Sequence, residues 1–179
     1  VWFNGNSTNY VRKYIKNNKI YFHDELINIP NYGQNIEDIG LFKKIDLIQT
    51  HNLKPKFVSI RNYLSGNAVG TTRDEELARQ IINIILCKLY DEKFTKNEDI
   101  LQFRAGINED AKLVAERIQN RFNEAKIIYK DVLDEKDTID LDDKSLRYVV
   151  GELQNYSLMS AQRDVIGDAF EIFIHRALK

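Results

Sequence analysis

One stretch decides the fold of this chain: Thr72-Arg-Asp-Glu-Glu-Leu-Ala-Arg-Gln-Ile-Ile-Asn-Ile-Ile-Leu-Cys-Lys-Leu-Tyr-Asp-Glu-Lys93. Thr72 and Glu75 have the spacing of a capping box, in which a hydroxyl and a carboxylate satisfy free amides of the first helical turn. Apolar side chains follow on more than one side of the expected helix, at Leu77, Ala78, Ile81, Ile82, Ile84, Ile85, Leu86 and Leu89. Such a helix must be contacted from several directions, and Asp91, Glu92 and Lys93 are expected to return it to solvent. The stretch therefore predicts the central helix of a mainly α protein, a multi-helix bundle.

Composition supports one packed domain. The chain has 179 residues, of which 43% are hydrophobic and 30% are charged, which is enough for one proper core. No apolar run approaches the roughly 20 residues that a membrane-spanning helix needs. The single cysteine, Cys87, falls in the central helix, where a buried structural thiol is expected. We therefore predict a soluble, cytoplasmic protein without an internal disulfide.

The charge distribution is uneven along the chain. Residues 1–70 carry 9 of the 26 Lys and Arg residues but only 5 of the 27 Asp and Glu residues. The front part is therefore basic and the rest is acidic. This asymmetry is compatible with nucleic-acid contact by the front part, although a solvated charged surface is the commoner cause of such a bias.

Three parts can be distinguished. Residues 1–27 contain two β-rich runs, Thr8–Ile15 and Lys19–His23, joined by a turn with two asparagines, so a short N-terminal β-hairpin is expected. Residues 28–53 hold Pro30, Gly33 and Gly40 and are expected to form a connector. Residues 54–179 are expected to form the helical domain.

Further helices are expected on both sides of the central one. Residues 54–66 should form a short helix with Phe57, Ile60 and Leu64 on its inner face. After an extended run at 100–104, residues 108–132 should form a long amphipathic helix with an inward apolar seam that runs from Ala111 to Ile128, Tyr129 and Val132. Its charged face, with Arg117 and Arg121, should be solvated. The acidic stretch 134–143 is expected to be an exposed linker, and Asp142 or Asp143 should cap a helix with inner residues Leu146, Val149, Val150 and Leu153. A last helix should use Val165, Ile166, Ala169, Phe170, Phe173, Ile174 and Ala177.

Catalytic motifs are not found in the sequence. It has no phosphate-cradling glycine loop, no Cys or His pair at metal spacing and no serine elbow, and His23, His51 and His175 lie far apart. The acidic stretch lacks the glycine and the terminal glutamate of a calcium-binding loop. No catalytic, cofactor-binding or metal-binding residue is therefore assigned. The chain begins without Met and ends within a helical pattern, so we expect a piece of a longer protein.

Two stretches carry a family resemblance. Leu53-Lys-Pro-Lys-Phe-Val-Ser-Ile-Arg-Asn-Tyr-Leu64, followed by Ile85-Leu-Cys-Lys-Leu-Tyr-Asp-Glu92, resembles the helical N-terminal region of DNA N6-adenine methyltransferases of the type I restriction-modification kind. Leu153-Gln-Asn-Tyr-Ser-Leu-Met-Ser-Ala-Gln-Arg-Asp-Val-Ile-Gly-Asp-Ala-Phe-Glu-Ile-Phe173 is similar to the segment that leads into the methyltransferase domain of that family. The resemblance implies a parent enzyme that uses S-adenosylmethionine and in which this helical part is not catalytic. A glycine-rich Phe-Phe-Thr-Pro loop and an Asn-Pro-Pro-aromatic motif would follow in the parent.

The front of the chain resembles a subgroup in which a nuclease-like domain precedes the helical region. The matching parts are Ile29-Pro-Asn-Tyr-Gly33 and the approach from Leu47 to Lys54, which implies that residues 1–27 are the end of that upstream domain. The partners implied are double-stranded DNA and specificity or restriction subunits. Since phosphate contacts position a protein on DNA without reading sequence, basic residues near the connector are the DNA-backbone candidates. They are Lys43, Lys44, Lys54, Lys56 and Arg61.

Two other functions remain open at this stage. A helical protein-interaction or regulatory module without a DNA role is the main alternative to the methyltransferase domain. A nuclease is a poor third, because no Asp followed by Glu-x-Lys can be placed in the hairpin.

Overall fold

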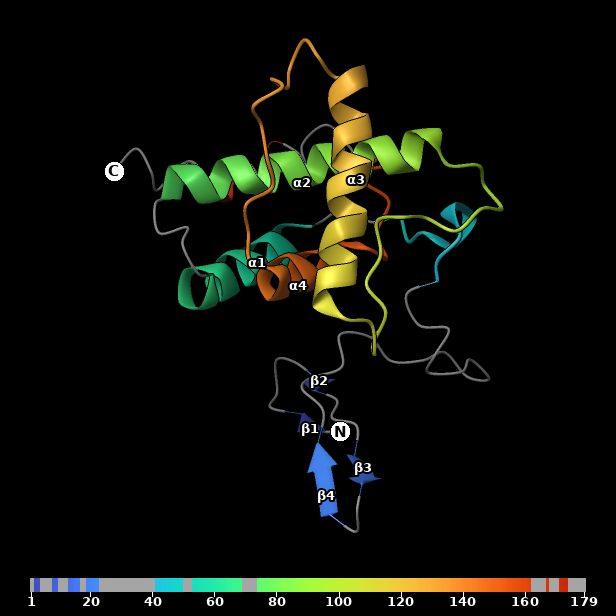
Figure 1. Ribbon diagram of the computed structural model, residues 1–179, viewed down its shortest axis with the longest axis vertical. Helices are drawn as coiled ribbons and strands as arrows, with labels where there is room; N and C mark the ends of the chain where they lie inside the picture. The colour runs from blue at the N-terminus through green and yellow to red at the C-terminus, as the bar shows by residue number, and fades with distance from the viewer. Residues whose placement is uncertain are drawn as a thin grey trace.

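In a computed structural model, the described part of the chain folds around four long helices (Figure 1). The structure describes residues 2–3, 8–9, 13–16, 19–22, 41–49, 53–68, 74–161, 167 and 171–173. The helices are α1 (Lys54–Asn67), α2 (Asp74–Phe94), α3 (Ala111–Ile128) and α4 (Asp143–Leu153), with a short 3-10 helix η2 at Lys44–Asp46. The predicted mainly α fold is confirmed.

Two short antiparallel strand pairs precede the helices. Strand β1 (Trp2–Phe3) pairs with β2 (Thr8–Asn9), and β3 (Lys13–Lys16) pairs with β4 (Lys19–Phe22). In the second pair Lys16 faces Lys19, and the two asparagines between them lie outside the described residues.

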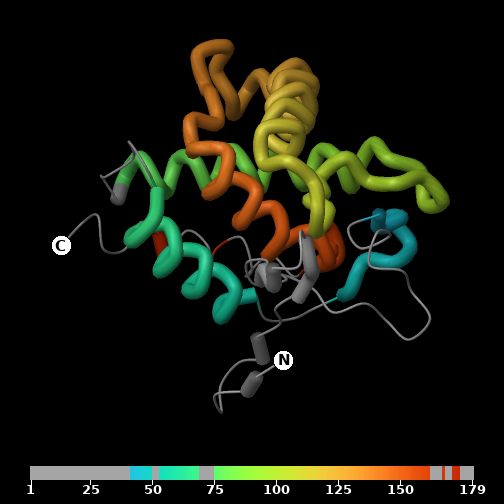
Figure 2. The backbone as a smooth tube through the Cα atoms, turned by 60° about the horizontal axis from the view of Figure 1, so that its bottom comes forward, coloured from blue at the N-terminus to red at the C-terminus, as the bar shows by residue number. Residues whose placement is uncertain are grey.

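The helices pack in the order α1, α4, α3, α2 around one core. Figure 1 shows α3 crossing α2 steeply, with α1 and α4 side by side below α2, and Figure 2 shows the same arrangement from another direction. Phe57, Ile60 and Leu64 of α1 are buried as predicted, and so are Leu146, Val149, Val150 and Leu153 of α4. None of the described helices is long and apolar enough to cross a membrane.

Helix α2 is buried on several sides, as its apolar pattern predicted. Ile81, Ile84 and Cys87 are at most 1% exposed, and the Cys87 thiol contacts the carbonyl oxygen of Ile118 at 3.7 Å. Burial raises the pKa of this thiol, since the thiolate would lie among apolar side chains. The expected capping residue Thr72 lies outside the described residues.

Helix α3 is shorter than expected. Asp110 caps its start by accepting a hydrogen bond from the Lys112 amide at 2.8 Å, and the helix ends at Ile128, before Val132. The chain turns at Tyr129, where the amides of Val132 and Leu133 both donate to the Tyr129 carbonyl. Ile128 and Val132 are therefore exposed, and the prediction that they continue the buried seam is wrong.

Two segments expected to be free of the core are attached to it. In the acidic stretch, Ile139 and Leu141 are buried, and Gln80 and Asn83 of α2 bind the backbone of Asp140 and Thr138 at 2.7 and 3.0 Å. The carboxylates of the stretch remain largely at the surface, but its backbone lies along α2. An exposed linker is therefore the wrong description of residues 134–143.

The connector is also partly fixed. Its described part, residues 41–49, bonds to two distant segments: Leu101 donates to Phe42 O at 2.9 Å, and Ile48 exchanges backbone hydrogen bonds with Asn155 and Ser157 at 2.8 and 2.9 Å. Lys43 forms an antiparallel bridge with Ile100, which agrees with the extended run expected there. Of the last predicted helix, Phe173 is buried against Phe57, while most of its other members lie outside the described residues.

Candidate functional site

The last turns of α2 hold a cluster of buried charges. Lys88 and Asp91 are fully buried and Glu92 is 1% exposed, and Arg121 of α3 reaches the same place. We call these four residues the α2 cluster. The expectation that Asp91 and Glu92 lead the helix into solvent is therefore wrong, and of the three residues named there only Lys93 is exposed. Both carboxylates tolerate burial because each is surrounded by donors.

Asp91 connects α2 to the following loop and to α3. One carboxylate oxygen accepts from Arg121 Nε at 2.7 Å and from Thr95 Oγ1 at 3.2 Å, and the other accepts from the Phe103 amide at 2.8 Å. Arg121 also donates to Thr95 Oγ1 and to Glu124. Asp91 thus fixes both ends of the loop between residues 95 and 103.

Glu92 connects α2 to a segment beyond α4. Its carboxylate accepts from the amides of Leu158 and Met159 at 2.9 and 3.0 Å and from Ser157 Oγ at 2.9 Å. Lys88 Nζ lies 3.1 Å from the same carboxylate and 5.1 Å from the centre of the Phe103 ring. Lys88 and Glu92 therefore form an ion pair, but Lys88 Nζ makes no well-directed hydrogen bond to any described residue. Burial lowers the pKa of Lys88, although the charge of Glu92 opposes that shift.

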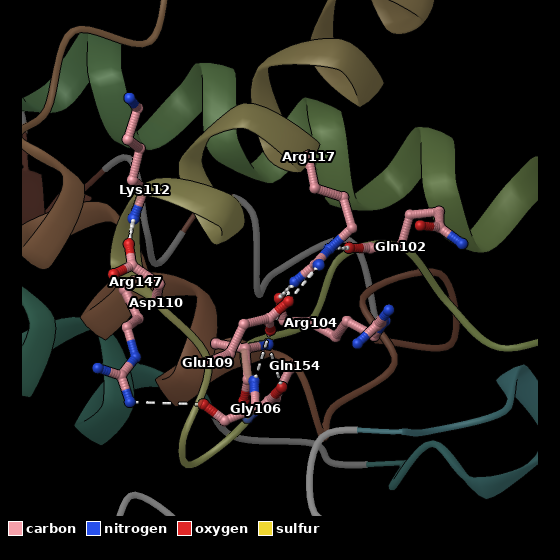
Figure 3. A network of polar contacts seen from close by, with 10 residues as sticks. Gln102, Arg104, Gly106, Glu109, Asp110, Lys112, Arg117, Arg147 and Gln154 are labelled. Atoms are coloured by element: carbon pink, nitrogen blue, oxygen red, sulfur yellow. Dashed lines mark hydrogen bonds and ion pairs between the residues drawn. The ribbon is translucent and has the colours of Figure 1, made fainter.

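A second network holds the loop before α3 (Figure 3). Arg117 forms a two-pronged ion pair with Glu109, with Nη2 at 2.8 Å from Oε2, and it donates to the carbonyl oxygens of Gln102 and Arg104 at 3.1 and 2.7 Å. Glu109 also accepts from the Gly106 amide at 2.9 Å. Burial alone would raise the pKa of Glu109, but the bonds from Arg117 and Gly106 outweigh it and lower that pKa.

The prediction that Arg117 and Arg121 are merely solvated is thus wrong. Their side chains are only 16% and 17% exposed, because every nitrogen of each guanidinium donates to an acceptor of the protein. A guanidinium with all its nitrogens engaged is a structural group and not a free anion receptor.

Helix α4 holds the same loop from the other side. The side-chain amide of Gln154 accepts from Ala105 N through Oε1 at 2.8 Å and donates to Ala105 O through Nε2 at 3.3 Å. Arg147 donates to Ile107 O at 2.7 Å. Figure 3 shows Arg117, Arg147 and Gln154 reaching this loop from different elements. Residues 102–107 of the loop between α2 and α3 are therefore held mainly by side chains, whereas residues 97–101 pair with the backbone of residues 42–45.

The DNA-backbone candidates fall into two groups. Lys43 and Lys44 lie at η2, where Lys43 pairs with Glu98 at 3.3 Å and Lys44 donates to the Thr95 carbonyl at 3.2 Å. The other three lie on α1, where Lys54 pairs with Glu171 at 3.5 Å and Lys56 with Glu152 at 2.9 Å. Arg61 is half-buried and has no ion-pair partner among the described residues. The five cations thus form no single track.

The described residues give little support for metal binding or for chemistry by histidine. No group of three or more His, Cys, Asp or Glu side chains among them is arranged to hold a metal ion. All three histidines lie outside the described part of the chain. What the described side chains do is hold loops and helices together.

No protein-family model matches this sequence, and no curated protein does. The resemblance to adenine methyltransferases therefore rests on the residue stretches quoted above.

Proposed function

We propose that this chain is the non-catalytic helical domain of an S-adenosylmethionine-dependent DNA adenine-N6 methyltransferase of a restriction-modification system. In that parent it helps to clamp DNA or to hold partner subunits against the catalytic domain. The methyl donor belongs to the parent's catalytic domain, and no residue of this chain is assigned to it. An enzyme that extrudes a base from the duplex needs such a second surface to hold the DNA in place.

The observation that supports this proposal is that the segments carrying the family resemblance pack on one another. The ring of Phe57 in the first segment lies edge-on to the ring of Phe173 in the last, with 6.5 Å between the ring centres, and Lys54 pairs with Glu171. Glu92 of the middle segment binds the backbone of Leu158 and Met159 in the last. A resemblance spread over distant parts of the chain is more meaningful when those parts form one packed unit.

The cations of α1 are suited to weak backbone contact. Lys54 is held by the exposed carboxylate of Glu171, and Lys56 is 38% exposed although its partner Glu152 is only 13% exposed; pairs at the surface contribute only about 0–1 kcal/mol. DNA phosphates can therefore compete for these ammonium groups. The contact should be indifferent to sequence and strongly sensitive to salt.

The test is a salt titration of DNA binding. Affinity of the chain for a short duplex is measured by fluorescence anisotropy at several salt concentrations, for wild type and for Lys54→Gln, Lys56→Gln, Arg61→Gln together. The slope of log K against log salt is negative, and each lost phosphate contact makes it less steep by about 0.9. The slope of the triple variant should therefore be less steep than that of the wild type by up to about 3. The matched control replaces three exposed lysines elsewhere, Lys112, Lys130 and Lys136, by Gln, with the same change in charge.

Equal slopes for the two triple variants would remove α1 from the DNA interface. The parent's class is tested separately by the gene, in which the Phe-Phe-Thr-Pro loop and the Asn-Pro-Pro-aromatic motif are expected after residue 179. If both motifs are missing there, the methyltransferase proposal fails whatever the DNA result.

The second candidate function, a helical protein-interaction module, is favoured by a different observation. An acidic groove with exposed apolar side chains lies beside α3, and none of the α1 cations lines it. Its chemistry suits a protein partner better than a phosphate backbone.

A further inference from the structure

Two neighbouring hollows lie between the outer face of α3 and the loop that follows α2. Their volumes are about 610 and 420 Å³, and Gln102 and Arg121 line both, so the two hollows adjoin and are taken together as one groove. We call it the α3 groove. Hollows of this size each accept a few side chains.

The helical half of the groove is one stripe of α3. Leu113, Glu116, Arg117, Asn120, Arg121 and Glu124 all line it, and their spacing of three and four residues places them on one side of the helix. The opposite stripe, with Val114, Ile118, Phe122 and Ala125, is fully buried in the core. The groove is therefore presented by a helix that the core holds firmly in place.

Apolar side chains are exposed at both ends of the groove. Phe94 and Ile100 are 48% and 42% exposed at the loop end, and Leu113 is 55% exposed near the start of α3. Large exposed apolar side chains gathered in a concave place, unlike single ones scattered over a surface, are typical of a binding site.

The charge that remains available in the groove is negative. Four carboxylates line it: Glu98 pairs with Lys43 and Glu124 with Arg121, whereas Asp99 and Glu116 have no ion-pair partner among the described residues. The two guanidiniums of the lining, Arg117 and Arg121, are already neutralised by Glu109 and Asp91 and have every nitrogen engaged. A phosphate would meet carboxylates here and two arginines whose charges are already paired, whereas an ammonium or guanidinium would be attracted.

We propose that the α3 groove binds a basic amphipathic segment of a partner protein. Apolar side chains of that segment contact Phe94, Ile100 and Leu113, and its Lys or Arg side chains pair with Asp99 and Glu116, which have no ion-pair partner among the described residues. Charge complementarity together with apolar contact selects this occupant over nucleic acid. The inference goes beyond the DNA proposal and does not depend on it, because the cations of α1 take no part.

The probe is a synthetic helical peptide in which Leu recurs every three or four residues, with Lys at the other positions, so that one face is apolar; it is labelled for fluorescence anisotropy. A second peptide has Glu in place of every Lys. Binding of the Lys peptide and not of the Glu peptide is expected. Asp99→Asn with Glu116→Gln should weaken it about fivefold to tenfold, as the loss of two partly exposed ion pairs implies. The matched control, Asp131→Asn with Glu135→Gln, removes the same charge from exposed positions elsewhere and should leave the dissociation constant unchanged.

Leu113→Asp separates groove binding from general attraction between charges. This variant makes the protein more acidic but removes an apolar contact, so the groove predicts weaker binding whereas unspecific attraction predicts tighter binding. Unchanged thermal unfolding of each variant shows that the fold is retained. Equal weakening by the control pair, tighter binding by Leu113→Asp, or no effect of Asp99→Asn with Glu116→Gln would each overturn the proposal.

Two further experiments test for other occupants of the α3 groove. Sedimentation of the wild type shows whether the groove is covered by a second copy of the chain, in which case Leu113→Asp would dissociate a dimer and the proposed partner would be wrong. The α1 triple variant should bind the Lys peptide as the wild type does. Loss of peptide binding in that variant would mean that the groove is not the site.

Discussion

Ion pairs cross between helices in two regions of this protein, and they differ in their surroundings. In the α2 cluster, Asp91 and Glu92 are at most 1% exposed and each accepts at least three hydrogen bonds or ion-pair contacts. Between α1 and α4, Lys56 pairs with Glu152 at 2.9 Å, but the Lys56 side chain is 38% exposed. This second region, the α1–α4 seam, also contains the stacked rings of Tyr63 and Tyr148, 3.7 Å apart, and the hydroxyl contact of Tyr148 with Ser59.

The comparison teaches that the same chemistry has different consequences in the two regions. A buried carboxylate has lost its water, so any missing partner leaves a charge that nothing compensates. In the seam, water replaces a missing partner at little cost, and the stacked rings supply much of the contact. Removal of one charge should therefore be severe in the α2 cluster and mild in the seam.

The largest effect is expected for Glu92→Gln. The change leaves Lys88 buried without a counter-charge and should lower the free energy of unfolding by about 3–5 kcal/mol. Lys88→Met should cost less, about 1–2 kcal/mol, because Glu92 keeps its three other donors at Ser157, Leu158 and Met159. Urea unfolding followed by circular dichroism measures both. Equal costs would show that those donors do not hold the carboxylate without the ammonium.

An intermediate, pH-dependent effect is expected for Glu109→Gln. The charge-assisted bonds to Arg117 and Gly106 are expected to contribute about 1–3 kcal/mol at neutral pH. Because the folded pKa of Glu109 is lower than its unfolded value of about 4.3, this contribution is complete above that value and is lost as pH falls through the folded pKa. The difference in unfolding free energy between wild type and variant should shrink in strong acid. Glu135→Gln, at an exposed position, is the control, and a difference independent of pH would contradict the assignment.

The smallest effect is expected in the seam. Lys56→Met should change the unfolding free energy by no more than about 1 kcal/mol, because the pair is partly exposed and the ring stack of Tyr63 and Tyr148 is untouched. Thermal unfolding of Lys56→Met and Glu152→Gln, singly and together, gives the coupling between them. A coupling as large as that between Lys88 and Glu92 would remove the distinction between the two regions.

Much of the helical fold could be predicted from the sequence because its signals are local. Pro55 near the start of α1 and the periodic Phe57, Ile60 and Leu64 lie within a few turns of one another. The cap of α4 is equally local, since Asp142 accepts from the Ser145 amide three residues later at 3.0 Å. Where the cause of an element lies inside the element, the pattern of residues is sufficient.

The partners of the buried charges could not be predicted, because they lie far along the chain. No residue close to Asp91 in the sequence indicates that Arg121 is its partner, and none close to Glu92 indicates Leu158. One signal was present, however: two carboxylates in the last turn of a helix oppose its dipole and should have cations or amides nearby. That argument would have indicated compensation without identifying the partner.

The end of α3 and the path of the connector were missed for a related reason. Ile128 and Val132 fit the helical period, but the backbone turns at Tyr129 and leaves them exposed. Residues 41–49 look like a linker from their sequence, yet their amides and carbonyls pair with segments around residues 97–101 and 155–157. Backbone pairing of irregular segments has little sequence signature.

Glu92 accepts hydrogen bonds from three groups beyond α4, and this affects how fast two backbone amides there exchange their hydrogens with solvent. The amide hydrogens of Leu158 and Met159 lie in no regular element, and by local structure alone they would exchange quickly with deuterium. Their acceptor, however, is a buried side chain 66 and 67 positions earlier, on the last turn of α2. These two amides can open only when that turn opens, so they should exchange as slowly as the interior of α2 and mark the segment as part of the same cooperative unit.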